Sequence, residues 1–400
     1  MQFLFIDNEK LCVYKDGKVT EYESNYLKKY REASLISAKN SEWRRNSRTE
    51  MLLNEGFFYD NEEVFARLYA IAPTAKENEF VYSFCVNDSS GIYLKYLEDE
   101  KNLEAHLISS NQVEFTTLFA SKQNLLATVR KGDVAADIAI FSSDGSEYKS
   151  VTSGDSLDEN PSIDRDGNIL FNTYGIARDE NNNFLGYCGS EICRLNLRTM
   201  QIEEVLFKQD FSFVKPMQSK EGIYCIKRPH GEKDESNAFI DILMIPVRIV
   251  KAIVGFVSAF TTLFSGEPLV SEGRKTDGRS LVRNYKKDEQ RLLVMNKMVK
   301  VDRELKRNKK YRNYGFIPRS WKLISQGVTE GVPGWWEEEI FSGVADYCVL
   351  EDGTLIFTNG KHLFSFDGEY ITKILDVDCC IKVSACQQSP FEIARAFDEL

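Results

Sequence analysis

Proline and histidine are scarce in this chain of 400 residues, and each scarcity excludes something. Nine prolines are too few for a proline-rich linker. The three histidines, His106, His230 and His362, lie far apart in the sequence, so none has a second histidine nearby to complete a catalytic or metal site. The opening segment MQFLFIDNEK lacks a basic start and a long apolar core, so we expect no secretory signal peptide.

The nine cysteines lack the pattern of a disulfide framework or a zinc site. Their number is odd, their spacing is irregular and no C-x-x-C pair occurs. Most lie in apolar, strand-like runs, so we expect buried, reduced thiols in a cytoplasmic protein. The loose pair Cys188 and Cys193 is a poor match to zinc-ligand spacing.

Catalytic motifs are also missing. No G-x-S-x-G elbow and no glycine-rich phosphate loop occurs in the sequence. Residues 164–168 resemble a calcium loop only in part, because the third acidic ligand before the glycine is absent, and we expect a turn there. We therefore assign no catalytic, cofactor-binding or metal-binding residue from the sequence.

Short strands dominate what is present. Runs of five to eight residues rich in β-branched and aromatic types alternate with turns, and Asp-Gly dipeptides recur at 16–17, 144–145, 166–167, 352–353 and 367–368. An Asp-Gly dipeptide between apolar runs is a strong hairpin signal. The pattern predicts an all-β chain whose hydrophobic content of 42% is sufficient for a core.

A four-strand unit repeats along the chain. The second strand of each unit begins at Phe80, Leu125, Ile169, Gly222 and Thr354, and the first four starts are 45, 44 and 53 residues apart. Four strands in such a period are typical of a β-propeller blade. We predict one domain over residues 1–400, a six-bladed β-propeller. Complete blades begin near Val64, Val113, Leu157, Phe211 and Gly343.

Seven blades remain open, because the interval from Gly222 to Thr354 is long enough to contain one more. The two ends of the chain complement each other. A lone strand begins near Asp378, and the N-terminus supplies three strands without a first. We predict that they share one blade, which closes the ring and removes exposed sheet edges.

Residues 158–171, DENPSIDRDGNILF, resemble the repeat of TolB-like propellers. In that family a Pro-Ser pair precedes a Pro-Asp-Gly turn and an apolar strand, whereas this chain has Arg165 at the proline position of the turn. Residues 350–357 match in part. The resemblance implies a six-bladed ring, and it leaves the function open because such rings serve binding, scaffolding and gating.

Two mainly helical insertions are expected to interrupt the ring. One covers residues 24–56, between the shared blade and the next, and the other covers residues 231–318, inside the fifth blade. A short helical tail is expected over residues 387–400. The second insertion contains an apolar segment, 238–264, with helical periodicity from Val247 to Phe264.

That helix presents a wide apolar face. Arg248 and Lys251 mark its narrow polar edge, and Phe256, Phe260 and Phe264 belong to the apolar remainder. The charge-free stretch 252–266 is short for a transmembrane span. Packing on the ring, packing on a partner such as a second copy, and docking in a membrane interface remain open.

A basic segment follows the helix. From Arg274 to Lys322 the chain has 17 Lys or Arg and 5 Asp or Glu, although the net charge of the whole chain is -10. Such segregation suits an anionic surface, while internal pairing with the acidic remainder is the alternative and nucleic acid is unlikely. The candidate residues in the densest part are Arg303, Lys306, Arg307, Lys309, Lys310 and Arg312.

A second candidate surface is aromatic. Trp335 and Trp336 follow a Gly-Val-Pro-Gly turn, where they would contact a partner, line the ring mouth or pack under the insertion. From these features we expect a non-enzymatic binding or scaffold protein of the cytoplasm. It would dock through residues 231–318 on an anionic membrane surface or a protein partner. The alternative is an enzyme with its active site in the central channel.

Overall fold

The computed structural model describes residues 1–30, 32, 33, 36, 66–74, 76, 78–86, 89–97, 103–120, 125–132, 134–142, 145–181, 184–218, 222–230, 291–328 and 335–385. Most of the described residues are in strands, so the predicted all-β class is confirmed. The expected apolar helix of residues 238–264, the expected tail of residues 387–400 and most of the first insertion lie outside the described residues. Residues 25–30 of that insertion are helical.

One sheet joins the two ends of the described chain. Its order is β26-β1-β2-β3, with β26 (Cys380–Ser384), β1 (Gln2–Asp7), β2 (Lys10–Lys15) and β3 (Lys18–Tyr22). The register of β26 on β1 runs from Leu4 opposite Ser384 to Asp7 opposite Cys380. Asp16 and Gly17 both have positive φ, 49° and 88°, which is the turn geometry that an Asp-Gly hairpin signal predicts.

Three further four-stranded sheets are built from hairpins. The first has the order β4 (Ala66–Pro73), β5 (Glu79–Val86), β6 (Ser89–Tyr96), β7 (Glu104–Ser110). The second has the order β16 (Phe211–Gln218), β17 (Ile223–Pro229), β20 (Lys322–Val328), β21 (Trp335–Ser342). The third has the order β22 (Asp346–Val349), β23 (Leu355–Thr358), β24 (His362–Phe366), β25 (Ile371–Asp376).

An eight-stranded sheet combines two more sets of four. One set is β8 (Val113–Ala120), β9 (Leu125–Lys131), β10 (Ala135–Phe141) and β11 (Tyr148–Ser150). The other is β12 (Ser156–Ile163), β13 (Ile169–Arg178), β14 (Phe184–Asn196) and β15 (Gln201–Leu206). The parallel pairing of Ala136 with Leu157 links them. This single pair makes the two sets one sheet by hydrogen bonding.

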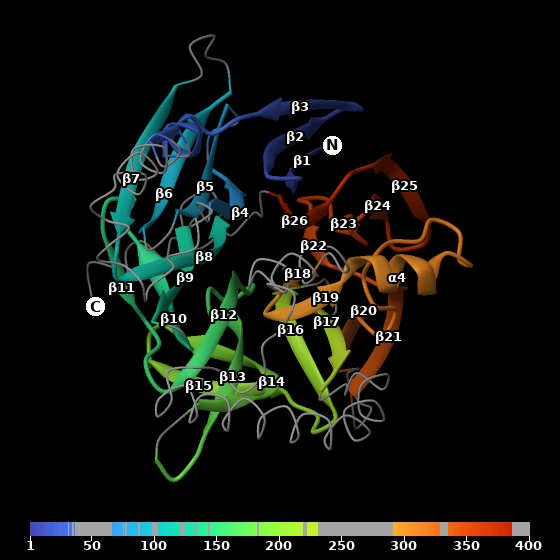
Figure 1. The fold of residues 1–400 in the computed structure, drawn as a ribbon. Helices are drawn as coiled ribbons and strands as arrows, with labels where there is room; N and C mark the ends of the chain where they lie inside the picture. Colours follow the sequence, from blue (N-terminus) through green and yellow to red (C-terminus); the bar gives the residue numbers. More distant parts are fainter. Residues whose placement is uncertain are drawn as a thin grey trace, which may run out of the picture.

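The six sets surround a common centre (Figure 1). The strands nearest that centre, which we call the inner strands, are β26, β4, β8, β12, β16 and β22. Neighbouring inner strands contact one another from β22 through β26, β4, β8 and β12 to β16. Lys215 of β16 then forms an ion pair of 2.5 Å with Asp346 of β22.

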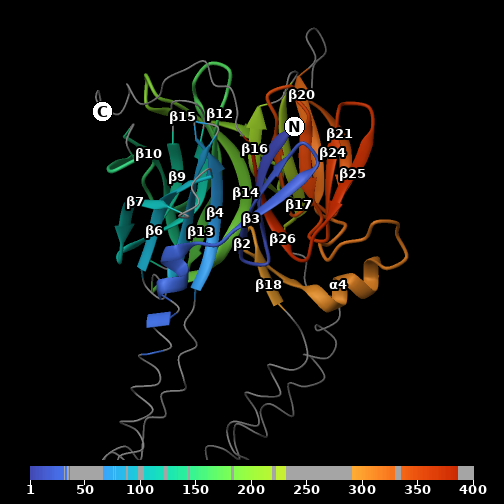
Figure 2. The same cartoon turned by 90° about the horizontal axis from the view of Figure 1, so that it is seen from above.

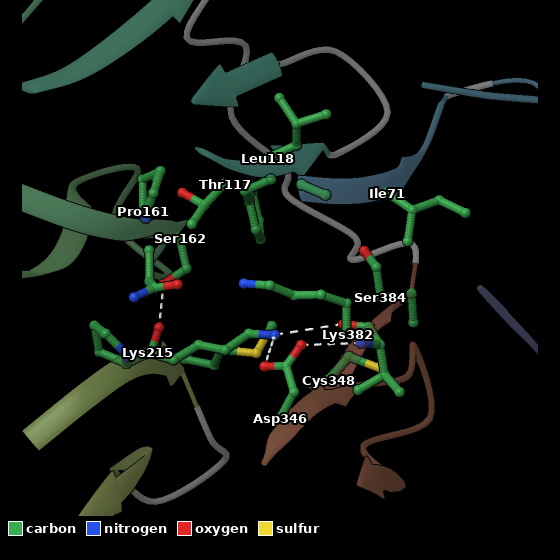
Figure 3. A pocket seen from close by; sticks show the side chains of 17 residues that line it. Ile71, Thr117, Leu118, Pro161, Ser162, Lys215, Asp346, Cys348, Lys382 and Ser384 are labelled. Carbon is green, nitrogen blue, oxygen red and sulfur yellow. Dashed lines mark hydrogen bonds and ion pairs between the residues drawn. The ribbon is translucent and has the colours of Figure 1, made fainter. Parts of the chain in front are cut away.

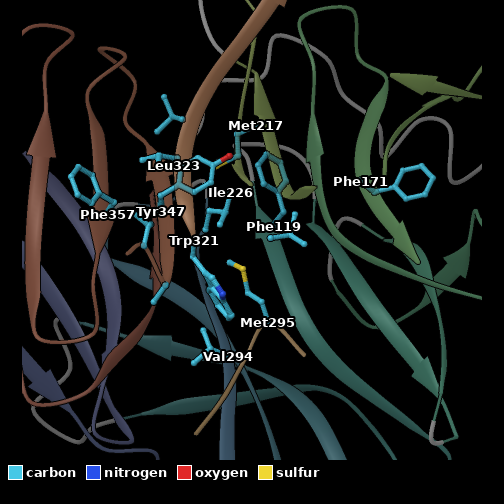
Figure 4. Close-up of a cluster of buried hydrophobic side chains, with 14 of the residues drawn as sticks. Phe119, Phe171, Met217, Ile226, Val294, Met295, Trp321, Leu323, Tyr347 and Phe357 are labelled. Carbon is cyan, nitrogen blue, oxygen red and sulfur yellow. The ribbon is translucent and has the colours of Figure 1, made fainter. Parts of the chain in front are cut away.

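A hairpin and a helix lie between β17 and β20, where the sequence predicted a mainly helical insertion. The hairpin consists of β18 (Arg291–Val294) and β19 (Lys297–Lys300), and α4 (Val301–Asn308) follows directly. Both lie on one side of the sheets (Figure 2). Val294, Met295 and Trp321 pack into the largest buried cluster, beside Phe119 and Tyr347 from distant strands (Figure 4). The segment is therefore part of the core.

Candidate functional site

A pocket at the centre of the molecule is lined by residues from all six inner strands (Figure 3). Its polar lining consists of Thr117, Asn160, Ser162, Lys215, Asp346, Lys382 and Ser384. The cavity volume is about 40 Å³, which is room for a few waters or one small polar group. A pocket of this size does not hold a drug-sized substrate.

Irregularities in the inner strands place these side chains in the pocket. The register shifts between Leu68 and Ala70 in β4, and corresponding shifts occur in β8, β12 and β16. The shifted positions in β12 and β16 include Asn160 and Lys215, whose φ values are 53° and 54°. A β-bulge redirects the side chains beside it. The lining residues 70–71, 117–119, 160–162 and 215–217 all lie at or just after these bulges.

Two of the three charged side chains of the pocket form an ion pair, and the third does not. Asp346 accepts from Lys215 Nζ at 2.5 Å through Oδ1 and from the Val383 backbone N–H at 2.9 Å through Oδ2. Figure 3 shows Lys382 extended into the pocket. Within the described chain, no acceptor lies within hydrogen-bond distance of Lys382 Nζ, and no carboxylate lies within ion-pair distance of it. One positive charge is thus left without a protein counter-charge in contact.

Burial determines the protonation behaviour of the pocket. The Lys382 pKa is lowered, chiefly because desolvation penalises the ammonium, and the nearby Asp346 only partly opposes this effect. Desolvation also raises the pKa of the Cys348 thiol to about 12, so this thiol is protonated and a poor nucleophile at neutral pH. No histidine is among the lining residues.

The β18–β19 hairpin, which we call the plug hairpin, lies toward the other end of the inner strands. Its turn residues Met295 and Asn296 have φ values of 44° and 60°. Asn296 donates to Glu159 of β12 and accepts from Arg130 Nη2 of β9 at 3.0 Å. Arg67 of β4 donates to the Leu293 carbonyl at 2.8 Å. The plug hairpin therefore contacts β4, β9 and β12, which belong to three different strand sets.

Arg228 of β17 supplies a further anchor. It is 4% exposed and donates to the Met295 carbonyl at 2.8 Å and to the Tyr174 hydroxyl at 2.5 Å. Its guanidinium lies 5.0 Å from the centroid of the Trp321 ring. Cation–π contacts of this kind stabilise a buried guanidinium that has no carboxylate partner.

Five predicted cations form an exposed group, the basic platform, on α4 and the turn that follows it. Its members are Lys306, Arg307, Lys309, Lys310 and Arg312. Arg303 is on the same helix but is half-buried. Arg307 is 3.9 Å from Glu304. Among the residues that the structure describes, no carboxylate lies within 4.0 Å of the other four platform cations.

Hydrogen bonds and buried side chains hold the backbone of the basic platform in place. The Asn308 side chain donates to the carbonyls of Gly315 and Ile317, both at 3.0 Å. Asn359 donates to the Asn313 carbonyl at 2.8 Å. Phe316 and Ile317 are each 1% exposed in the core. The cations therefore project from a rigid base, and Phe316 is buried and unavailable for stacking.

The remaining predicted site residues are less informative. Arg248, Lys251, Phe256, Phe260 and Phe264 lie outside the described residues. Trp335 and Trp336 begin β21, the outer strand of its sheet, and Trp336 is half-buried.

Other classes of site have little support among the residues that the structure describes. No cluster of three or more potential metal ligands occurs in that part of the chain. No helix within the same residues has the length and apolar character of a membrane span. None of the described cysteines forms a disulfide, and most of them are buried.

Sequence reasoning missed the central pocket. Lys382 and Ser384 are polar residues two positions apart in an otherwise apolar strand, and Asp346 begins another buried strand. A polar residue within a predicted inner strand was the available signal. The bulges that bring these residues together have no clear mark in the sequence.

No family model matches the sequence, and no curated protein matches it. TolB from Acinetobacter baumannii is a similar solved structure, with a TM-score of 0.49 and 9% identity over 97% of this chain and 66% of that chain. The tricorn protease has a TM-score of 0.42 and 13% identity over 96% of this chain and 30% of that chain.

A putative 6-phosphogluconolactonase from Bacteroides fragilis has a TM-score of 0.41 and 9% identity over 96% of each chain. This chain thus spans just under two thirds of the length of the TolB structure and less than a third of the tricorn protease chain. These similarities are too distant to carry a functional argument. Function must be argued from the residues of this chain.

Proposed function

We propose that the chain is a six-bladed β-propeller, closed by the pairing of β26 with β1, and that it acts as a non-enzymatic binding protein. Each set of four strands is one blade. The arrangement of six inner strands around one pocket supports this interpretation, and so does the sheet that joins the two ends. Sets of strands arranged around a closed ring leave only short, protected sheet edges.

The binding surface in this proposal is the basic platform, and its ligand is an anionic membrane. The observation that carries the proposal is the group of five exposed cations on a rigid base, of which only Arg307 is close to a described carboxylate. Each cation near an anionic leaflet contributes about 1 kcal/mol, so five contribute about 5 kcal/mol. Tyr311 and Tyr314, 39% and 38% exposed, suit the polar–apolar boundary of a bilayer.

The geometry favours lipid over nucleic acid. Base stacking requires an accessible aromatic face, but the Arg319 guanidinium lies 4.0 Å from the centroid of the Tyr311 ring. Phe316, the third aromatic residue of the segment, is buried. The apolar helix that the sequence predicts over residues 247–264 would add membrane-inserted side chains.

The proposed location is the cytoplasm, at the membrane surface. None of the described cysteines forms a disulfide, which agrees with a reducing compartment. The cytoplasmic leaflet is also the anionic one in cells whose inner leaflet carries phosphatidylserine. A peripheral, salt-sensitive association follows from this placement.

The test is co-sedimentation with vesicles of phosphatidylcholine, with and without one third phosphatidylserine. We expect binding only to the anionic vesicles, and weaker binding at physiological salt than at low salt. Replacing Lys306, Lys309 and Lys310 together with Gln removes about 3 kcal/mol and weakens binding roughly 100-fold.

A matched control changes three other exposed lysines, Lys15, Lys18 and Lys76, to Gln. Lys15 and Lys18 flank the turn beside Met1, which lies at the opposite side of the molecule from α4 (Figure 2). This variant has the same net charge but should bind as the wild type does. The membrane proposal is contradicted if both variants lose the same amount of vesicle binding, or if the wild type does not bind anionic vesicles at low salt. Binding of the wild type to an acidic protein would instead favour a protein partner.

The runner-up is an enzyme whose active site is the central pocket. Lys382, with its lowered pKa, is the observation in its favour. The rest of the lining is less suited to catalysis, because both Asp346 oxygens are engaged and the Cys348 thiol is protonated. Turnover of small esters, lactones or phosphates that Lys382→Met abolishes would favour this alternative.

A further inference from the structure

Lys382 and its surroundings contain an unbalanced charge. The nearby charges of Lys215 and Asp346 neutralise each other in direct contact, at 2.5 Å, and the Val383 N–H occupies the second Asp346 oxygen. The Lys382 ammonium points into the pocket, and the described residues provide no partner for it (Figure 3). Lys382 is half-buried, and an ammonium that is partly withdrawn from water without a counter-charge in contact is stabilised by an anion.

The strand places a second donor beside the ammonium. Side chains two positions apart lie on the same face of a strand, and Lys382 and Ser384 are so spaced in β26. Both line the pocket, and no described group lies within hydrogen-bond distance of the Ser384 hydroxyl. The Thr117 hydroxyl, which shares a hydrogen bond of 2.5 Å with Thr128, is a further polar group of the lining.

The volume of the pocket and the charges that line it restrict which anion it can bind. A cavity of about 40 Å³ admits one small head group and not a sugar or a nucleotide. A dianion such as phosphate would bring a second negative charge near Asp346 without a second cation to match it, since Lys215 is already paired. A single carboxylate matches both the volume and the one unpaired charge.

We propose that the central pocket binds one carboxylate group, held by the Lys382 ammonium and the Ser384 hydroxyl. The site is separate from the basic platform, which lies on α4 at the outside of the molecule. Its ligand is a small monocarboxylic acid or the terminal carboxylate of a peptide. The experiment distinguishes these two sources.

The first arm measures thermal unfolding in sodium acetate. The reference is sodium chloride at equal ionic strength with an equal concentration of acetamide, which has the shape of acetate but no charge. At an acetate concentration about ten times the dissociation constant, we expect the wild-type Tm to rise by about 1–2 °C. Lys382→Met should abolish this rise. Lys18→Met, which removes an exposed lysine from β3, should retain it.

A second arm measures line broadening of ¹³C-labelled acetate at 25 °C on protein whose fold is verified by circular dichroism. This measurement does not depend on the relative stabilities of the variants. Replacing a buried charge with an apolar group of similar volume often leaves stability unchanged, so Lys382→Met should fold. Ser384→Ala should weaken acetate binding several-fold, which is the expected loss of one hydrogen bond to a charged group.

A third arm adds trialanine or its C-terminally amidated twin as a competitor. Displacement of acetate by the free acid alone identifies a chain terminus as a ligand, and no displacement by either identifies a small acid. The proposal is overturned if acetate raises the Tm of the wild type no more than the chloride and acetamide reference does, or if Lys382→Met binds acetate as well as the wild type does.

Discussion

At the scale of single residues, a fully buried ion pair fixes the start of the first helical segment. Lys95 and Glu104 are 2.7 Å apart, and their side chains are 0% and 1% exposed. The Glu104 carboxylate also accepts from the backbone N–H groups of Asn25 and Tyr26, at the first turn of the helical residues 25–30. Breaking such a pair leaves an uncompensated buried charge.

Glu104→Gln should therefore reduce the free energy of unfolding by about 3–5 kcal/mol, since Lys95 remains buried without its counter-ion. The matched control is Glu21→Gln, which removes the exposed partner of Lys10 and should cost about 1 kcal/mol or less. Urea unfolding followed by tryptophan fluorescence measures both values. Equal losses for the two variants would show that the buried pair has no special role.

At the scale of elements, the plug hairpin connects strands that are far apart in the sequence. Asn296 combines two properties, a positive φ of 60° and side-chain hydrogen bonds to β9 and β12. Asparagine tolerates the left-handed region better than most residues, so one residue serves both the turn and the contact.

Asn296→Gly retains the backbone freedom and removes the side-chain contacts, whereas Asn296→Ala removes both. We expect faster hydrogen exchange over residues 292–299 in both variants. Asn296→Ala should be less stable than Asn296→Gly by about 1 kcal/mol because alanine is strained at positive φ. Unchanged exchange in Asn296→Gly would mean that the core packing of Val294 and Met295 alone holds the hairpin.

The sequence predicted strands far better than the segments between them. The predicted second strands, starting at Phe80, Leu125, Ile169, Gly222 and Thr354, coincide within one residue with β5, β9, β13, β17 and β23. Their alternating apolar pattern and flanking turns are local properties. The plug hairpin was missed because its turn, Met295-Asn296, is stabilised by contacts with distant strands. The pocket was missed for the same reason, since six separate strands form it.

At the scale of the whole molecule, β26 connects the N-terminal strands with two other sheets. It pairs with β1 and contacts β22 and β4. Asp7 accepts from the backbone N–H groups of Asp378 and Cys379 at 3.1 and 2.6 Å, which fixes the approach to the strand. The Val383 backbone N–H in turn donates a hydrogen bond to the Asp346 carboxylate.

Deleting residues 378–400 should expose the edge of β1 and remove most of the stability or solubility of the protein. Deleting only residues 386–400 leaves β26 intact and serves as the control. Differential scanning calorimetry and size-exclusion chromatography measure the two effects. A protein without residues 378–400 that melts and elutes as the control does would contradict the proposed closure.

The pairing of β1 with β26 also has a consequence during translation. Leu4 is synthesised 380 residues before its partner Ser384. At about 5–20 residues per second, β1 waits roughly 20–75 s for this partner. Throughout that interval the nascent chain displays an open strand edge. The speed of translation, and not the stability of the finished fold, therefore determines how long the edge is exposed to misassembly on crowded polysomes.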